Sequence, residues 1–216
     1  MEWISVIAKG REAMTDRELL WDKRLQIRTA GRDEQNADQY RFPYEPTPYS
    51  VLERLAGSGL IGKQDVVLDY GCGKGRVGFF LSAQIQATSI GVEYDERIYR
   101  QALENRKTAL SKTKTDFVLA RAETYPVPAQ VNRCYFFNPF SAEILHKVMA
   151  RIIESYYENP REVLLFFYFP SSEYLSCLME EDALTFYDEI PCDDLFEGNA
   201  EREKIVVFSL PDLKDK

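Results

Sequence analysis

The sequence predicts an α/β fold of three layers, in which helices cover both faces of a mostly parallel, seven-stranded sheet that ends in an antiparallel hairpin. Two observations predict it. From residue 46 onward, short apolar runs alternate with amphipathic stretches, as they do in repeated β-α-β units. The last two apolar runs are joined by an acidic loop (193–199) without a strong helical pattern, so we expect them to pair as antiparallel strands.

Hydrophobic periodicity sets the bounds of each expected element. The expected strands are residues 66–70, 89–93, 116–120, 133–138, 163–169, 184–190 and 204–210. The expected helices are residues 15–29, 50–56, 75–84, 96–110, 142–157 and 172–181. The first helix would begin at a capping box formed by Thr15 and Glu18 and would stop at Gly31.

The stretch from Tyr40 to Tyr49 is rich in proline and aromatic residues, which predicts an extended, stiff loop leading into the next helix. We take this loop as the boundary between an N-terminal helical extension (1–45) and the main domain (46–216).

Charge and cysteine usage restrict the partners and the compartment. The chain of 216 residues has a formal net charge of -8, which repels phosphate backbones and disfavours bulk nucleic acid as a partner. Its longest apolar runs are strand-sized, so no membrane span is expected, and its first residues lack an export signal. The four cysteines lack a C-x-x-C spacing, which predicts reduced thiols in the cytoplasm and no metal site.

The strongest motif joins the first strand of the main domain to the following helix. Its residues are Asp69, Tyr70, Gly71, Cys72, Gly73, Lys74 and Gly75. Glycine is needed where the backbone takes positive φ or lies against a ligand, so the turn is expected to be a ligand cradle. The G-x-G-x-G spacing differs from the G-x-G-x-x-G of dinucleotide-binding turns. The Asp69 carboxylate would repel a pyrophosphate but suits the amino group of a cationic ligand.

This motif, read as D-x-G-x-G-x-G, resembles the first motif of class I, Rossmann-like S-adenosylmethionine-dependent methyltransferases, and the resemblance extends over about residues 46–210. It implies S-adenosyl-L-methionine as the cofactor, held by Asp69, Gly71, Cys72, Gly73 and Gly75, and transfer of its methyl group by direct displacement. It also implies that Glu93, at the end of the next strand, binds the ribose hydroxyls. Two oxygens of one carboxylate suit two vicinal hydroxyls.

The same resemblance implies further cofactor contacts. Tyr94 would lie near the adenine face, while Ala122 would allow close approach of the adenine and Glu123 would lie near its exocyclic amine. Tyr44 and Thr47 belong to an aromatic segment that is either a lid over the cofactor or a packing strap, and the sequence leaves both interpretations open.

The fourth strand is followed by Asn138, Pro139 and Phe140, which resemble the N-P-P-[YF] motif of methyltransferases that act on amino groups. The resemblance implies that Asn138 borders the cofactor and accepts a hydrogen bond from the target nitrogen, and that the Phe140 ring holds the planar group of the acceptor. Only one proline is present, so Phe140 falls one place early. We therefore expect an amine or amide nitrogen of a protein or small molecule as acceptor, or else a turn in which Asn138 caps the next helix.

Two other functions fit the same scaffold. The shortened Asn-Pro-Phe motif is compatible with a protein that binds S-adenosylmethionine without catalysis. An enzyme of aminopropyl transfer or of nicotinamide-linked chemistry would place a different ligand in the same cleft. The single histidine, His146, falls inside an expected helix and is interpreted as a solvated or packed position.

Overall fold

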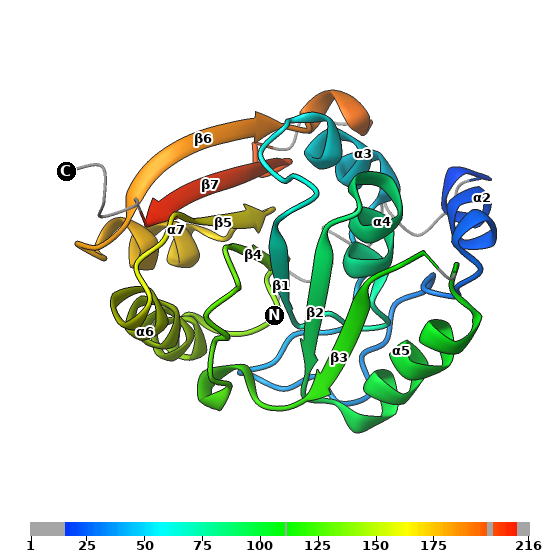
Figure 1. Ribbon diagram of the computed structural model, residues 1–216, viewed down its shortest axis with the longest axis horizontal. Coiled ribbons are helices and arrows are strands. Elements are labelled where there is room, and N and C mark those ends of the chain that lie inside the picture. Colours follow the sequence, from blue (N-terminus) through cyan, green and yellow to red (C-terminus); the bar gives the residue numbers. More distant parts are fainter. Residues whose placement is uncertain (1–15, 111, 198–200, 211–216) are drawn as a thin grey trace.

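The seven strands form one sheet in the order β3-β2-β1-β4-β5-β7-β6 (Figure 1). The computed structural model describes residues 16–110, 112–197 and 201–210. The strands are β1 (Val66–Tyr70), β2 (Thr88–Glu93), β3 (Thr115–Leu119), β4 (Arg133–Phe136), β5 (Val163–Tyr168), β6 (Thr185–Pro191) and β7 (Lys204–Leu210). Strands β1 to β5 pair in parallel, whereas β7 pairs antiparallel with both β5 and β6. The predicted fold is therefore confirmed.

Helices cover both faces of the sheet and define two hydrophobic cores. The helices are α2 (Asp16–Leu25), α3 (Tyr49–Gly57), α4 (Arg76–Ile85), α5 (Glu96–Thr108), α6 (Ala142–Glu158) and α7 (Ser172–Met179). One core contains buried residues of α3, α4 and α5, and the other contains those of α6 and α7. Neighbouring residues of β1 alternate between them, since Val67 belongs to the first core and Leu68 to the second.

Three stacked aromatic rings align the central strands. Tyr70 of β1 stacks on Phe136 of β4 with ring centroids 4.9 Å apart, and Phe136 stacks on Phe167 of β5 at 4.6 Å. These residues are also register partners in the sheet. Because cross-strand aromatic pairs favour one register, the segments that follow β1, β4 and β5 meet at the same edge of the sheet.

The first described helix, α2, ends earlier than predicted. It ends at Leu25, and Gln26 takes a left-handed conformation (φ 61°), so the predicted stop at Gly31 is wrong. The cause is Asp22, whose carboxylate accepts hydrogen bonds from the amide and the hydroxyl of Thr29 at 2.7 and 2.6 Å. This contact turns the chain back after the helix. Thr15, the expected N-cap, lies outside the described residues.

The end of β4 also differs from the prediction. The strand stops at Phe136, and Asn138 adopts a left-handed conformation (φ 40°). Ser141 is the N-cap of α6, because its hydroxyl accepts a hydrogen bond from the Ile144 amide at 3.4 Å. The alternative in which Asn138 caps that helix is therefore wrong. Two short 3-10 helices, η1 (Ala122–Thr124) and η2 (Asp193–Leu195), were not predicted.

Candidate functional site

A cavity of about 80 Å³ lies at the carboxyl ends of β1, β2 and β4. Strand β1 lies between β2 and β4, at the point where the strand order reverses direction. Open α/β sheets bind their ligands at such a point. Ten of the residues selected from the sequence line this cavity. They are Tyr44, Thr47, Asp69, Gly71, Cys72, Glu93, Tyr94, Ala122, Glu123 and Phe140. Gly73, Gly75 and Asn138 are near it but do not line it.

Two carboxyl groups give the cavity its electrostatic character. Asp69 is only 3% exposed, and its Oδ2 has no hydrogen-bond partner among the described residues. Burial, together with the neighbouring Glu93 carboxylate, raises the pKa of Asp69 to about 8. An unpartnered buried carboxyl group is costly unless a ligand pairs with it, so the site fits a cationic group such as the one S-adenosylmethionine carries.

Glu93 is held by the backbone around it. One carboxylate oxygen accepts hydrogen bonds from the amides of Tyr94 and Asp95, both at 2.9 Å, and the other accepts from the Gly73 amide at 3.0 Å. Burial raises the pKa of Glu93, and these three amides oppose the shift. A carboxylate offers about four acceptor positions, so Glu93 keeps limited capacity for a hydroxyl donor.

The glycine turn has the predicted backbone, but its surroundings differ from the prediction. Gly71, Gly73 and Gly75 all have positive φ (69°, 56° and 86°). A Cβ on Gly73 would overlap the Tyr44 ring, and one on Gly71 would overlap Pro139. The expectation of open room at this turn is therefore wrong for Gly73, because the N-terminal segment covers it.

That covering segment, residues 30–47, is called the strap below. The buried Arg76, the first residue of α4, fixes the chain at both of its ends. Its Nε donates to the Thr29 hydroxyl at 2.7 Å and its Nη1 to the Thr47 carbonyl at 3.1 Å. The Thr47 hydroxyl is also 3.0 Å from that of Tyr135. Figure 1 shows the strap running along the edge where β1, β2 and β3 end.

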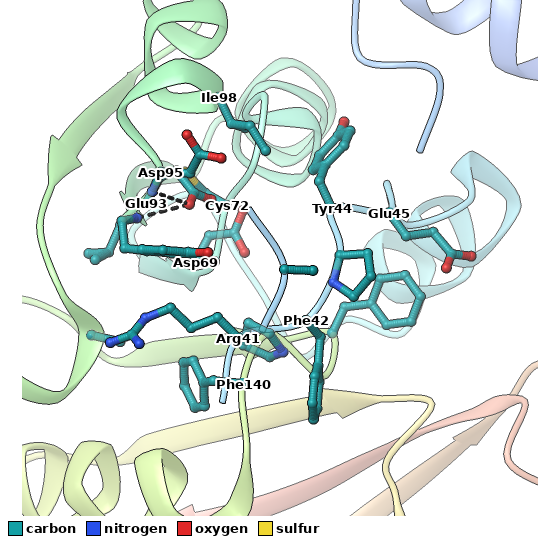
Figure 2. A pocket seen from close by; sticks show the side chains of 18 of the residues that line it. Arg41, Phe42, Tyr44, Glu45, Asp69, Cys72, Glu93, Asp95, Ile98 and Phe140 are labelled. Atoms are coloured by element: carbon teal, nitrogen blue, oxygen red, sulfur yellow. Dashed lines mark hydrogen bonds between the residues drawn. The ribbon is translucent and has the colours of Figure 1, made fainter. Parts of the chain in front are cut away.

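Arg41, in the middle of the strap, lines the cavity. It was not predicted from the sequence as a site residue. The Arg41 guanidinium is 2.8 Å from the Glu123 carboxylate and lies 4.8 Å above the Tyr94 ring. Figure 2 shows Arg41 extending between Asp69 and Phe140. Arg41 thus contacts Tyr94 and Glu123, two of the three residues that were expected beside adenine. No local motif indicates it, because its partners are distant in the chain.

The turn after β4 contains the acceptor-side candidates. Asn138 donates through Nδ2 to the Phe169 carbonyl at 2.5 Å, and its Oδ1 is buried without a partner among the described residues. The Pro139 carbonyl accepts from the Phe42 amide of the strap at 3.2 Å. The Phe140 ring lines the cavity, but it is only 4% exposed and packs edge-to-face against Phe136. Phe140 is therefore largely a core residue here.

Cysteine and metal chemistry are not indicated by the remaining lining residues. Burial raises the pKa of the Cys72 thiol well above its ordinary value, so Cys72 lines the cavity as a neutral group. No cluster of three potential metal ligands occurs within the described ranges. No helix in the described part of the chain is long and apolar enough to cross a membrane.

Comparisons with known proteins agree with this geometry. Residues 67–158 match the family model described as a methyltransferase domain. A curated protein-lysine N-methyltransferase of Saccharolobus islandicus is 34% identical over 64 residues, which are 29% of this chain and 40% of that relative. The matched part is therefore less than half the length of that relative.

Two solved structures illustrate the similarity in fold. An RNA methyltransferase of Salinibacter ruber, in complex with S-adenosyl-L-homocysteine, is 16% identical with a TM-score of 0.55, covering 77% of this chain and 94% of its own. A human methyltransferase 10 domain containing protein is 15% identical with a TM-score of 0.57, covering 89% and 93% respectively. At these identities the likeness concerns the fold.

The sheet order, the site and the family match agree with one another. Residues 67–158 match the model of a methyltransferase domain, and the sheet to which they contribute strands has the order β3-β2-β1-β4-β5-β7-β6 of a Rossmann-like fold. S-adenosylmethionine is the cofactor of methyltransferases with this fold, and the buried Asp69 Oδ2, which has no partner among the described residues, fits its positive charge.

Proposed function

We propose that this chain transfers the methyl group of S-adenosylmethionine to an amine nitrogen, with the lysine side chain of a protein as the leading acceptor. The observation that carries the proposal is the Asn138 amide oxygen in the turn beside the cavity, which is buried and has no hydrogen-bond partner in the described part of the chain. An acceptor of this kind, close to the cavity, can bind the N–H group of an incoming amine.

The cofactor, when bound, supplies an electrophilic methyl group on a positively charged sulfur. Asp69 would hold its amino group and Glu93 its ribose, next to Gly71 and Cys72. Tyr94, Ala122 and Glu123 would surround the adenine. In this proposal the strap is a lid, and Tyr44 and Arg41 must move from Gly73 and from Glu123 before the nucleoside enters.

The acceptor nitrogen would be held by two oxygens of one turn. A lysine ammonium must first lose one proton to solvent. The Asn138 Oδ1 and the Pro139 carbonyl can then both accept hydrogen bonds from the neutral amine, which orients its lone pair toward the methyl carbon. The Pro139 carbonyl becomes available when the Phe42 amide of the strap leaves it. The net charge of -8 attracts a cationic lysine side chain, and the curated relative is a protein-lysine N-methyltransferase.

Transfer of radiolabel tests this function directly. The protein is incubated with S-adenosylmethionine labelled in its methyl group and a cell extract, which is then separated into protein, nucleic acid and small molecules. We expect label in the protein fraction, recovered as methylated lysine after hydrolysis. Label confined to nucleic acid would overturn the proposed acceptor, and label in no fraction would overturn catalysis.

Replacing Asn138 separates the acceptor side from the cofactor side. In Asn138→Ala we expect the rate of methyl transfer to fall roughly fivefold to tenfold, as for the loss of one hydrogen bond. The dissociation constant of the cofactor, measured by calorimetry, should change by less than about twofold. Asn159→Ala, at the exposed end of α6, is the matched control. A larger effect on cofactor binding than on transfer would place Asn138 in the cofactor pocket.

A further inference from the structure

The antiparallel strand β7 brings a distant arginine to the acceptor side of the site. Because β7 runs opposite to β5, its amino end lies at the edge where β5 ends. The Phe169 amide, just after β5, donates to the Lys204 carbonyl at 2.9 Å. Arg202, two residues before β7, thereby lies against the turn that follows β5.

Arg202 makes three contacts with that turn. Its Nη2 donates to the Phe169 carbonyl at 3.0 Å, and its Nε donates to the Pro170 carbonyl at 3.0 Å. Its guanidinium carbon also lies 4.2 Å above the Phe169 ring. The planar guanidinium satisfies two adjacent carbonyls at once, which the ammonium of a lysine cannot do in the same geometry.

The Phe169 carbonyl is shared by Arg202 and Asn138. Because a carbonyl only accepts hydrogen bonds, the Nδ2 end of the Asn138 amide must face Phe169, and the Oδ1 end must face away. Asn138 and Phe169 both have left-handed backbones (φ 40° and 52°), which are strained for residues other than glycine. Such a turn needs contacts that hold it, and Arg202 supplies them on the Phe169 side.

We propose that Arg202 is a positioning residue for methyl transfer, which fixes the Phe169 carbonyl and thereby points the Asn138 amide oxygen at the acceptor nitrogen. This inference rests on the proposed function. Arg202 itself touches neither the cofactor nor the acceptor in this scheme. Its contribution is the orientation of one amide group, and errors of orientation reduce the rate of a positioned reaction.

The orientation can be measured without an acceptor. In the full-length protein labelled with ¹⁵N, the side-chain amide signal of Asn138 is assigned by its loss in Asn138→Ala. We expect this signal to move toward that of a solvent-exposed asparagine in Arg202→Met and to stay closer to wild type in Arg202→Lys. Arg151→Met, on the exposed face of α6, is the control and should leave the signal unchanged. An unchanged signal in Arg202→Met overturns the inference.

Methyl transfer supplies the second readout. Against the extract protein that the wild type methylates, we expect the rate for Arg202→Met to fall about fivefold, with the calorimetric affinity for S-adenosylmethionine unchanged. The double variant Asn138→Ala/Arg202→Met should be no slower than Asn138→Ala alone, because both changes act through one amide. Rate reductions that multiply in the double variant would show that Arg202 acts independently of Asn138, and this would overturn the inference.

A merely structural role for Arg202 predicts different results. It would lower the melting temperature and the cofactor affinity of Arg202→Met together, and Arg202→Lys would not restore the amide signal. If no extract fraction takes up label, the proposed function fails, while the amide signal still decides whether Arg202 orients Asn138.

Discussion

Lowering the pH from 7.5 to 6.0 is expected to weaken the binding of S-adenosylmethionine about twentyfold, through protonation of Asp69. With a pKa of about 8, Asp69 is mostly neutral in the free protein over this range, and its ionised fraction falls about tenfold per pH unit. The cationic ligand binds the protein in which Asp69 is ionised. The α-amino group of the ligand stays largely protonated below pH 7.5, so it does not mask the effect.

Few other groups can produce this pH dependence. The single histidine, His146, is exposed on α6 and does not line the cavity. Burial places the pKa of Cys72 far above the range, and Glu93, whose pKa is also raised, would change affinity in the same direction as Asp69. In Asp69→Asn we expect weaker binding, by roughly 1.5 to 3 kcal/mol at pH 8, and a smaller dependence on pH than in the wild type.

The measurement is calorimetric titration at several pH values, with Asp188→Asn on the exposed strand β6 as the control. The control should keep the pH dependence of the wild type. An Asp69→Asn variant with wild-type affinity, or with an unchanged pH profile, would contradict the role of Asp69.

The same carboxyl group links stability to pH in the opposite sense. The folded protein keeps the Asp69 proton up to a pKa of about 8, whereas the unfolded chain loses it near 3.8. Between these values the folded state binds more protons, so its free energy of unfolding decreases as pH rises. Asp69→Asn should therefore melt at a higher temperature than the wild type at pH 8, and the difference should vanish toward pH 4.

Local patterns in the sequence predicted the fold and one half of the site. Strands β1 and β7 have the predicted bounds, and the glycine turn has the predicted left-handed backbone, because both depend on residues near in sequence. Contacts between distant residues were not predictable in the same way. The Tyr44 ring on Gly73 and the Arg202 contact with Phe169 each join segments that no local rule pairs.

The conformation of the strap was predicted from local sequence patterns, whereas its contacts with the rest of the domain were not. Its proline and aromatic residues predicted an extended segment, but the sequence left its role open between a lid and a packing strap. The structure shows that Thr29, just before the strap, and Thr47, its last residue, are held by Arg76, while Arg41 in its middle contacts Glu123 and Tyr94. The middle is also held by the ion pair of Arg97 with Asp33 at 2.6 Å and by the hydrogen bond from Asn36 to Asp95 at 2.9 Å. Opening as a lid would require these contacts to break as well.

If the strap is a lid, removing the contacts of Arg41 with Glu123 and Tyr94 should speed the binding of the cofactor. The Arg41 and Glu123 side chains are only 16% and 15% exposed, so their ion pair is worth more than a surface pair, and the Tyr94 contact adds to it. If the closed strap limits binding, Arg41→Ala should raise the association rate of S-adenosylmethionine on the order of twentyfold in stopped-flow fluorescence. Arg32→Ala is the matched control, because Arg32 pairs only with Glu34 and Glu45 of the strap itself among the described residues. Its association rate should equal that of the wild type. A slower association in Arg41→Ala, or a weaker affinity with the rate unchanged, would mean that Arg41 holds the bound cofactor and does not close the site against it.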